Sequence, residues 1–360
     1  VGQAGAGVYP LLRENNAQGA CDMGALPDFL PGYRKVSDPQ AREVFEREWG
    51  VRVPESEGLS GIEMISKALN KEIRGMVLVG ANTVETFPDS RMMQRALNTL
   101  DFLVVIDIFL TPTAKLAHVV LPAACFAEKD GTYTNCERRI QRIRKAVEPP
   151  GEGRPDWRIV ADLISMMGVK AEYNSPADIM EEISRTTPIY GGVNYSRLED
   201  KALHWPCSGP DDPGTDILYA ESFPAGKGRF TKVEYLIPDD EPDIRYPFYL
   251  IARSHLYHFG SGARTKRSRL LTDISHPPSV EISPEDAEKL GVENGQNIRL
   301  TSKTGSVILK ARITDGILPG MLFYPVSVSA SKINSLFSAE LDMLTRTPNK
   351  KMCVVNIDRV

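Results

Sequence analysis

The chain has 360 residues, which is enough for two or three domains with separate cores. Its apolar fraction of 42% and charged fraction of 25% are those of a globular protein, and its formal charge of −4 argues against general nucleic-acid binding. No apolar run reaches the roughly 18–20 residues that span a bilayer, and no signal peptide is visible. We therefore expect a cytoplasmic protein with no membrane span and no nucleic-acid partner.

The five cysteines are scattered along the chain and are never spaced as Cys-x-x-Cys. They are Cys21, Cys125, Cys136, Cys207 and Cys353. This pattern predicts reduced thiols rather than a disulfide framework. It also predicts no metal or iron–sulfur site built from this chain alone.

An opening segment over residues 11–36 contains paired asparagines and several glycines, and it has no sustained helical or strand period. A loop so rich in small residues gains little from ordering by itself. We therefore expect it to lie against a ligand or another part of the backbone.

The part of the chain up to residue 204 predicts a doubly wound α/β domain with a mainly parallel sheet. In chain order, the apolar pattern predicts a helix over 61–70, a strand over 76–80, a helix over 90–100, strands over 102–107 and 118–122, and a helix over 156–167. Because the strands are continuously apolar and are joined by helical crossovers, we expect helices on both faces of the sheet.

The rest of the chain changes character. Residues 205–246 are rich in Pro, Asp and Gly, which predicts a linker. Alternating strands and tight turns then predict a compact β-barrel over 247–360, because a barrel closes short strands without free edges. Within it, Ser283 and Gly291 have the positions of the N-cap and end of a short helix, and residues 303–305 have the composition of a hairpin turn.

Loops that leave the carboxyl ends of the predicted strands are the first candidates for a ligand site. Gly80 allows close approach of a backbone, Asn82 offers hydrogen bonds, and Asp107 stands where a carboxylate accepts from a ribose hydroxyl or a purine amine. Asp107 is as readily explained as a strand-end cap, and Asn82 as a turn residue. The three loops together indicate a nucleotide site better than any one of them does, but these residues alone do not favour it over the simpler roles.

Further along the chain, basic residues over 136–146 and 262–271 could neutralise phosphates, or could be solvated surface. Arg253, Tyr257 and His258 fall at a strand end, where contact with an anionic cofactor and simple packing are both open. Hydrolase, kinase and simple dinucleotide motifs (GxSxG, HExxH, the P-loop and GxGxxG) are absent.

Several blocks carry a family resemblance. They are "ENNAQGACDMGALPDFLPGY", "LDFLVVIDIFLTPTAKLAHVVLPAACFAEKDGTYTNCERRIQRIRKAVEPPGEGRPDW", "VEISPEDAEKLGVENGQ" and "TPNKKMCVV". In order and spacing, over nearly the whole chain, they resemble the C-terminal half of formate dehydrogenase-like catalytic subunits of the molybdopterin oxidoreductase family.

The resemblance implies an α/β body followed by a barrel of the double-psi type. It implies a molybdopterin guanine dinucleotide cofactor with molybdenum or tungsten, and oxidation of formate to carbon dioxide. The iron–sulfur cluster and the metal-ligating residue would lie in a missing N-terminal half or a separate subunit, and electron-transfer subunits would be further partners. The chain alone would then be inactive, and no catalytic residue is assigned to it.

By position in the matching blocks, the resemblance also implies which residues hold the cofactor. The expected cofactor-binding residues are Arg13, Glu14, Gly80, Asn82, Asp107, Thr111, Asp156, Arg253, Tyr257, His258, Asn334 and Lys351. Within this set, Arg13 would orient the substrate anion. Asp156 would accept hydrogen bonds from the ring N–H and exocyclic amine of guanine.

The sequence departs from the family pattern at two places. Leu12 occupies the place of an arginine that holds the substrate oxygens, with Arg13 next to it, and Gly260-Ser261-Gly262 replaces a His-Thr-Gly. Two alternatives follow from related subunits. One is a pterin-free structural and electron-transfer subunit like the large iron–sulfur subunit of NADH dehydrogenase. The other is a nitrate, thiosulfate or polysulfide reductase.

Overall fold

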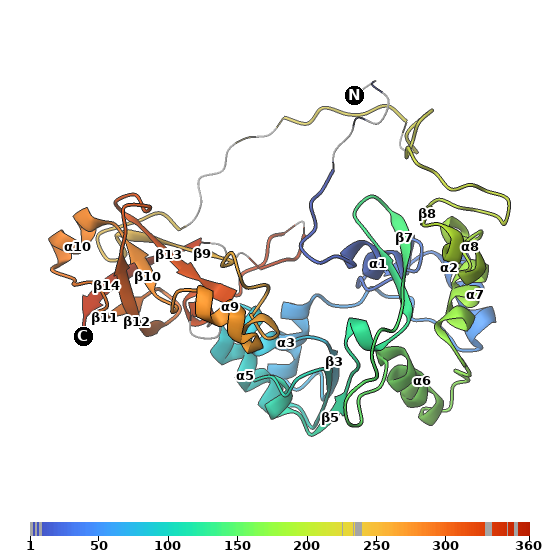
Figure 1. The fold of residues 1–360 in the computed structure, drawn as a ribbon, viewed down its shortest axis with the longest axis horizontal. Helices are drawn as coiled ribbons and strands as arrows, with labels where there is room; N and C mark the ends of the chain where they lie inside the picture. Colours follow the sequence, from blue (N-terminus) through green and yellow to red (C-terminus); the bar gives the residue numbers. More distant parts are fainter. Residues whose placement is uncertain are drawn as a thin grey trace. The chain divides into compact units, whose positions relative to one another are not determined.

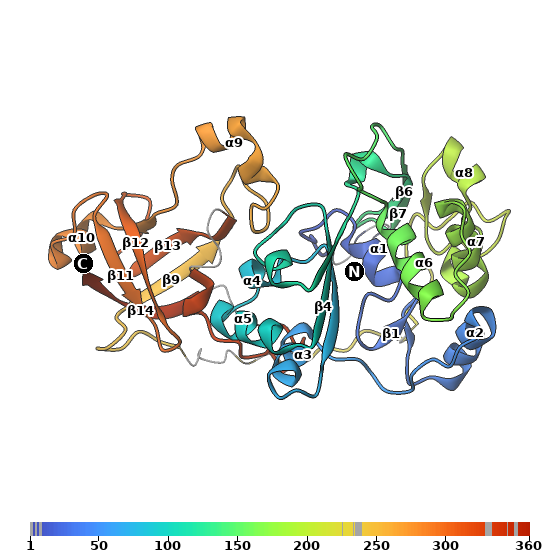
Figure 2. The same ribbon diagram turned by 90° about the horizontal axis from the view of Figure 1, so that it is seen from below.

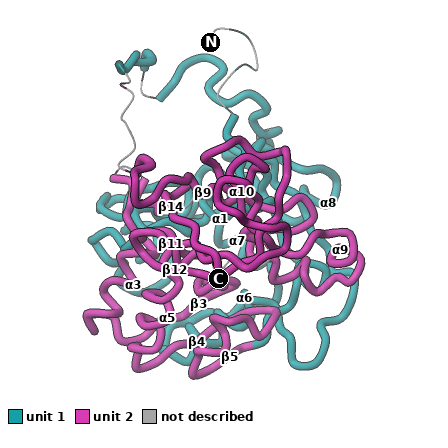
Figure 3. The backbone as a smooth tube through the Cα atoms, turned by 90° about the vertical axis from the view of Figure 1, so that its left-hand side faces the viewer, with its two compact units in different colours: residues 1–59, 122–233 teal, residues 60–121, 234–360 magenta. Residues whose placement is uncertain are grey.

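The fold is described from a computed structural model that covers residues 3, 6, 9–224, 226–232, 234, 240–327, 333–343, 345–348 and 352–360. The chain forms two compact units, which are coloured separately in Figure 3. Unit 1 comprises residues 1–59 and 122–233, and unit 2 comprises residues 60–121 and 234–360. Among the described helices, none is long and apolar enough to cross a bilayer.

Unit 1 contains more helix than strand, and its strands form two small antiparallel sheets. Its helices are α1 (Ala17–Asp22), α2 (Pro39–Trp49), η2 (Phe126–Glu128), α6 (Asp156–Met166), α7 (Pro176–Thr186), η3 (Pro188–Tyr190) and α8 (Tyr195–Asp200). Its strands are β1 (Phe29–Leu30), β2 (Arg34–Lys35), β6 (Gly131–Thr134), β7 (Arg139–Ile143) and β8 (Leu203–His204). The helix predicted over 156–167 is therefore confirmed as α6.

In unit 2, a three-stranded sheet is joined in sequence by helices. The elements are α3 (Gly61–Leu69), β3 (Gly75–Val79), α4 (Thr83–Thr86), α5 (Ser90–Thr99), β4 (Phe102–Asp107), η1 (Ala114–Leu116) and β5 (Val119–Pro122), which ends at the border of the units. The strand order is β3-β4-β5, and β3 runs parallel to β4. These bounds confirm the predicted helices and strands between residues 61 and 122.

Helices α3 and α5 lie side by side and share an apolar core with this sheet (Figure 2). Met93, Ala96 and Leu97 of α5 are fully buried there, as the helical spacing of its apolar residues predicts. The expectation that both faces are covered is wrong for β3. Its residues alternate, so that Val77 and Val79 remain 54% and 48% exposed.

The C-terminal part of unit 2 is a closed barrel of six strands in the order β10-β12-β11-β14-β9-β13 (Figure 1). The strands are β9 (Phe248–Arg253), β10 (Val280–Ile282), β11 (Asn297–Thr301), β12 (Ser306–Ile313), β13 (Met321–Pro325) and β14 (Met352–Arg359). The helices between them are η4 (Thr265–Arg267), α9 (Arg269–Ile274), α10 (Pro284–Leu290) and η5 (Asn334–Leu336).

Local signals in the barrel are confirmed. The Ser283 hydroxyl accepts from Asp286 N–H at 3.1 Å and caps α10, which ends on left-handed Gly291. Strands β11 and β12 pair as the predicted antiparallel hairpin. Alternate side chains such as Leu250, Ile298 and Leu322 point into a core that excludes water.

Contacts divide the chain differently from the predicted boundaries of 1–204, 205–246 and 247–360. Segment 60–121 groups with the barrel, because the Asp89 N–H lies 2.9 Å from the Asn334 carbonyl and 3.2 Å from that of Phe337. The predicted linker also begins too early, since Trp205 and Cys207 are buried in the core of unit 1. The predicted boundaries thus mark changes of fold type along the chain rather than compact units.

Candidate functional site

Two loops leave the carboxyl ends of the parallel strands β3 and β4. We call residues 80–89 the β3 loop and residues 108–113 the β4 loop. Gly80 begins the β3 loop with φ of +60°, and its N–H donates to the Ile106 carbonyl at 2.8 Å. A Cβ at Gly80 would meet no atom within 4 Å, so this glycine is needed for its left-handed backbone and leaves open space beside it.

Asn82 ties the two loops together. Its side chain is buried, and its Oδ1 accepts from the Thr113 hydroxyl at 3.0 Å and from Thr113 N–H at 3.4 Å. Its Nδ2 donates to Glu85 Oε2 at 2.5 Å. Because a carboxylate only accepts, this pairing fixes which end of the amide faces Thr113. The side chain therefore holds protein loops in place, and its contact with a dinucleotide stays a prediction.

In the β4 loop, Thr111 is also bonded within the protein, since it is buried and its Oγ1 accepts from Ala114 N–H at 3.2 Å. Asp107 ends β4 half-buried, and its Oδ1 accepts from Phe109 N–H at 3.1 Å. This bond matches the strand-end cap that the sequence left open for Asp107.

Thr83 is a residue that sequence reasoning missed. Its hydroxyl is buried and has no hydrogen-bond partner among the residues that the structure describes. Buried polar atoms are usually hydrogen-bonded, so an orphaned hydroxyl beside Gly80 suits a site that receives a polar ligand. Its place in the loop after a strand ending on glycine was the available signal.

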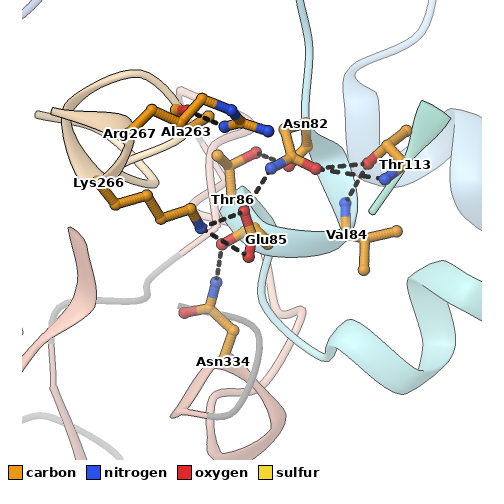
Figure 4. Close-up of polar contacts among 9 residues, drawn as sticks. All are labelled: Asn82, Val84, Glu85, Thr86, Thr113, Ala263, Lys266, Arg267 and Asn334. Atoms are coloured by element: carbon orange, nitrogen blue, oxygen red, sulfur yellow. Dashed lines mark hydrogen bonds and ion pairs between the residues drawn. The ribbon is translucent and has the colours of Figure 1, made fainter. Parts of the chain in front are cut away.

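Figure 4 shows barrel residues meeting the β3 loop within unit 2. Asn334 Nδ2 donates to the Glu85 carbonyl at 2.7 Å, and Lys266 Nζ lies 3.3 Å from Glu85 Oε1. The structure thus brings the predicted residue Asn334 to the same edge as Gly80 and Asn82. Glu85 was not predicted, and Lys266 was included only as part of the basic stretch over 262–271.

The other predicted barrel residues lie after β9. His258 is buried, and its ring nitrogens lie 3.0 Å from the Thr265 hydroxyl and 3.1 Å from the Ser275 hydroxyl, so it orders its own loop. Arg253 and Tyr257 are exposed, with the Arg253 guanidinium 4.3 Å from the centroid of a barrel phenylalanine ring. Lys351 lies outside the described residues.

The remaining predicted residues belong to unit 1, which is described by itself. Arg13 and Glu14 are exposed just before α1. Asp156 lies in the first turn of α6 and forms an ion pair with Lys129. Its contact with guanine stays a prediction, and any such contact competes with this lysine.

The opening loop is organised around Asp22, which is fully buried. Its Oδ1 accepts from Gln18 and Tyr33, each at 2.8 Å, and its Oδ2 accepts from Tyr190 at 2.7 Å. Burial raises the pKa of Asp22 above its ordinary value, while these hydrogen bonds lower it. Asp22 therefore anchors the opening segment to unit 1's own side chains, and contact of that segment with a ligand stays a prediction.

Among the described residues, no group of three or more His, Cys, Asp or Glu side chains could hold a metal ion. All five cysteines are free thiols, of which Cys207 and Cys353 are buried. Burial raises the pKa of the Cys353 thiol to about 12.

Comparison with known proteins gives matches over most of the chain. Residues 1–166 match the molybdopterin oxidoreductase family, and residues 248–354 match the "Molydopterin dinucleotide binding domain". F420-dependent formate dehydrogenase subunit alpha of Methanocaldococcus jannaschii is 44% identical over 100% of this chain and 54% of its own length. A second such subunit, from Methanococcus maripaludis, is 41% identical over the same shares.

A probable oxidoreductase of Bacillus subtilis is 40% identical over 97% of this chain and 36% of its own length. Among solved structures, acetylene hydratase from Pelobacter acetylenicus has a TM-score of 0.63 at 17% identity, covering 89% of this chain and 50% of the other, which shows the shared fold. The chain spans about half the length, or less, of the curated relatives it matches. It belongs to the molybdopterin oxidoreductase family, whose dinucleotide-binding domain is its C-terminal barrel.

Proposed function

We propose that this chain is part of a formate dehydrogenase that uses a molybdenum or tungsten pterin guanine dinucleotide. The observation that carries the proposal is the identity of 40–44%, over the whole chain, to three subunits named as formate dehydrogenase alpha subunits. The metal and pterin group, when bound, supplies the acceptor for the two electrons released as formate becomes carbon dioxide and a proton.

The residues of unit 2 fit a dinucleotide. Gly80 leaves space beside the backbone at the end of β3, the Thr83 hydroxyl is buried without a partner among the described residues, and Asp107 ends β4 half-buried. These are the groups that a nucleoside uses at the carboxyl edge of a parallel sheet. Asn82 and Thr111 support that edge by holding the loops.

In unit 1, Asp156 is proposed to accept hydrogen bonds from the guanine edge, and Arg13 to attract the formate anion. Both lie at exposed or partly exposed positions of their unit. Leu12, which stands where the family has its arginine, makes Arg13 the nearest cation in sequence for that task.

We also propose that the complete enzyme contains a further segment or subunit with the iron–sulfur cluster and the metal ligand, and electron-transfer subunits, in the cytoplasm. The relatives are about twice as long as this chain or longer, which supports additional domains. The alternatives of a pterin-free subunit and of a nitrate, thiosulfate or polysulfide reductase are not favoured by any relative reported above.

The test is to isolate the native complex that contains this chain, without added metal. We expect molybdenum or tungsten by elemental analysis, a fluorescent oxidised pterin after acid release, and formate-dependent reduction of a viologen dye. The isolated chain is expected to show no turnover. A native complex that lacks both metals and pterin would refute the proposal, and turnover of nitrate, thiosulfate or polysulfide but not formate would refute the substrate.

A further inference from the structure

Glu85 is a carboxylate buried at the candidate dinucleotide edge. Its side chain is 8% exposed, and its Oε1 and Oε2 lie 3.3 and 3.5 Å from Lys266 Nζ. Oε2 also accepts from Asn82 Nδ2, and the backbone carbonyl accepts from Asn334 Nδ2 (Figure 4). Burying an unpaired carboxylate at this depth is costly, and the ion pair with Lys266 offsets that cost.

The hydrogen bonds continue from Glu85 into the β4 loop. Asn82 Oδ1 accepts from the Thr113 hydroxyl, and the oxygen of that hydroxyl accepts from Val84 N–H at 3.0 Å. Thr113 is fully buried, and Asn82 and Val84 nearly so, so water does not readily replace these bonds. The chain of contacts runs from the barrel helix η4, through the β3 loop, to the β4 loop.

We propose that Glu85 and Lys266 are positioning residues for the dinucleotide edge. The carboxylate, paired with Lys266, accepts from the amide of Asn82 and fixes its orientation, and that orientation sets the spacing of the β3 and β4 loops. This inference rests on the proposed function for its ligand, but the loop geometry that it explains does not. Neither residue contacts the ligand in this scheme.

The buried ion pair gives the proposal a specific energetic signature. Lys266→Met leaves Glu85 buried without its cation, whereas Lys266→Met combined with Glu85→Gln removes both charges. Removing one partner of a buried ion pair destabilises a protein more than replacing both partners with uncharged residues. The double variant is therefore expected to disturb the loops less than Lys266→Met alone, which simple loss of packing would not produce.

The experiment is hydrogen–deuterium exchange on the full chain, followed at the amides of Val84 and Thr113. We expect exchange at both amides to be roughly tenfold faster or more in Glu85→Gln and in Lys266→Met, with the double variant closer to wild type than Lys266→Met. The matched control is Glu285→Gln, which removes one charge of the exposed Glu285–Lys289 pair on α10 of the same unit and should change neither amide. Unchanged exchange in Glu85→Gln, equal acceleration in Glu285→Gln, or a double variant worse than Lys266→Met overturns the proposal.

A second arm measures guanosine diphosphate binding to the same proteins by calorimetry. About tenfold weaker binding to Glu85→Gln, with unchanged binding to Glu285→Gln, supports the positioning role, and equal affinity for wild type and Glu85→Gln overturns it. If wild type does not bind the nucleotide, the proposed function loses support, and the exchange comparison decides the positioning role by itself.

Discussion

Replacing Tyr190 with phenylalanine tests how the opening loop is held. Tyr190 is 2% exposed, and its hydroxyl donates to Asp22 at 2.7 Å and lies 3.0 Å from the Thr134 hydroxyl. The substitution keeps the ring and removes one donor from a buried carboxylate. A hydrogen bond to a charged group contributes about 1.5–3 kcal/mol, so we expect a loss of about 2 kcal/mol in the free energy of unfolding.

This loss should depend on pH. Burial already raises the pKa of Asp22, and losing the Tyr190 donor raises it further. A carboxyl whose pKa is raised in the folded state stabilises when protonated, and that stability is lost as pH rises through the folded-state pKa. The difference between wild type and Tyr190→Phe is therefore largest above the raised folded-state pKa of Asp22, and it shrinks as the pH falls toward the ordinary range of aspartate.

The assay is urea unfolding at about pH 7 and about pH 5, with thermal unfolding as a check. For a unit of about 150–250 residues, a loss of about 2 kcal/mol lowers the melting temperature by roughly 4–8 °C. The matched control is Tyr173→Phe, which removes a similar 2.6 Å hydrogen bond to Glu182 at a partly exposed position. There water replaces the hydroxyl, and the loss should be about 1 kcal/mol or less. Equal losses in the two variants, or a loss in Tyr190→Phe that does not change with pH, would refute the reasoning.

Three further predictions concern single positions. Gly80→Ala should lower the free energy of unfolding by about 1–2 kcal/mol, because only the left-handed backbone strains the new Cβ. Gly262→Ala should lower it more, because its Cβ would lie 1.9 Å from the Ser327 carbonyl oxygen, and urea unfolding compares the two variants. Asp156→Asn should weaken the binding of guanosine diphosphate by about tenfold or more and strengthen the binding of xanthosine diphosphate, because an amide donates where the carboxylate accepts. Calorimetry on the native complex after cofactor release measures both affinities. Cys353, whose pKa is raised to about 12 by burial, should resist a thiol reagent at about pH 8 that labels the half-buried Cys125, and labelling of native Cys353 at the rate of Cys125 would contradict this.

Secondary structure was predictable wherever the signal is local. The helix over 90–100 follows from its apolar spacing, and α10 from its serine cap and terminal glycine. Strand β3 was predicted in place, but not its exposure, because a short apolar run does not say how many of its faces other residues cover. The beginning of the linker was misplaced because Pro and Asp in residues 205–215 favour turns even where neighbouring residues are buried.

The candidate site was only partly predictable, because its side chains find partners far away in the sequence. Asp22 and Tyr190 are 168 residues apart, and Lys266 and Glu85 are 181 apart. Position at a strand end selected Gly80, Asn82 and Asp107. The sequence does not show that the Asn82 amide is already hydrogen-bonded to Thr113 and Glu85. Position along the chain indicates where a ligand can bind, while the hydrogen-bond inventory decides which groups remain to bind it.

The hydrogen bonds at the edge of the β3–β4 sheet separate residues that hold the loops from groups that could contact a ligand. Asn82, Thr111 and Thr113 are buried and bonded to other parts of the protein, so in the proposed site they would contribute to affinity by holding the loops before a ligand binds. A loop that is already ordered saves the entropy that a flexible loop loses on binding. In the proposed site, direct recognition would fall to the open backbone at Gly80 and to the buried Thr83 hydroxyl, which has no partner among the described residues. Substitutions at the holding residues should therefore weaken binding by loosening the loops, whereas Thr83→Val should weaken it while leaving exchange at Val84 and Thr113 unchanged.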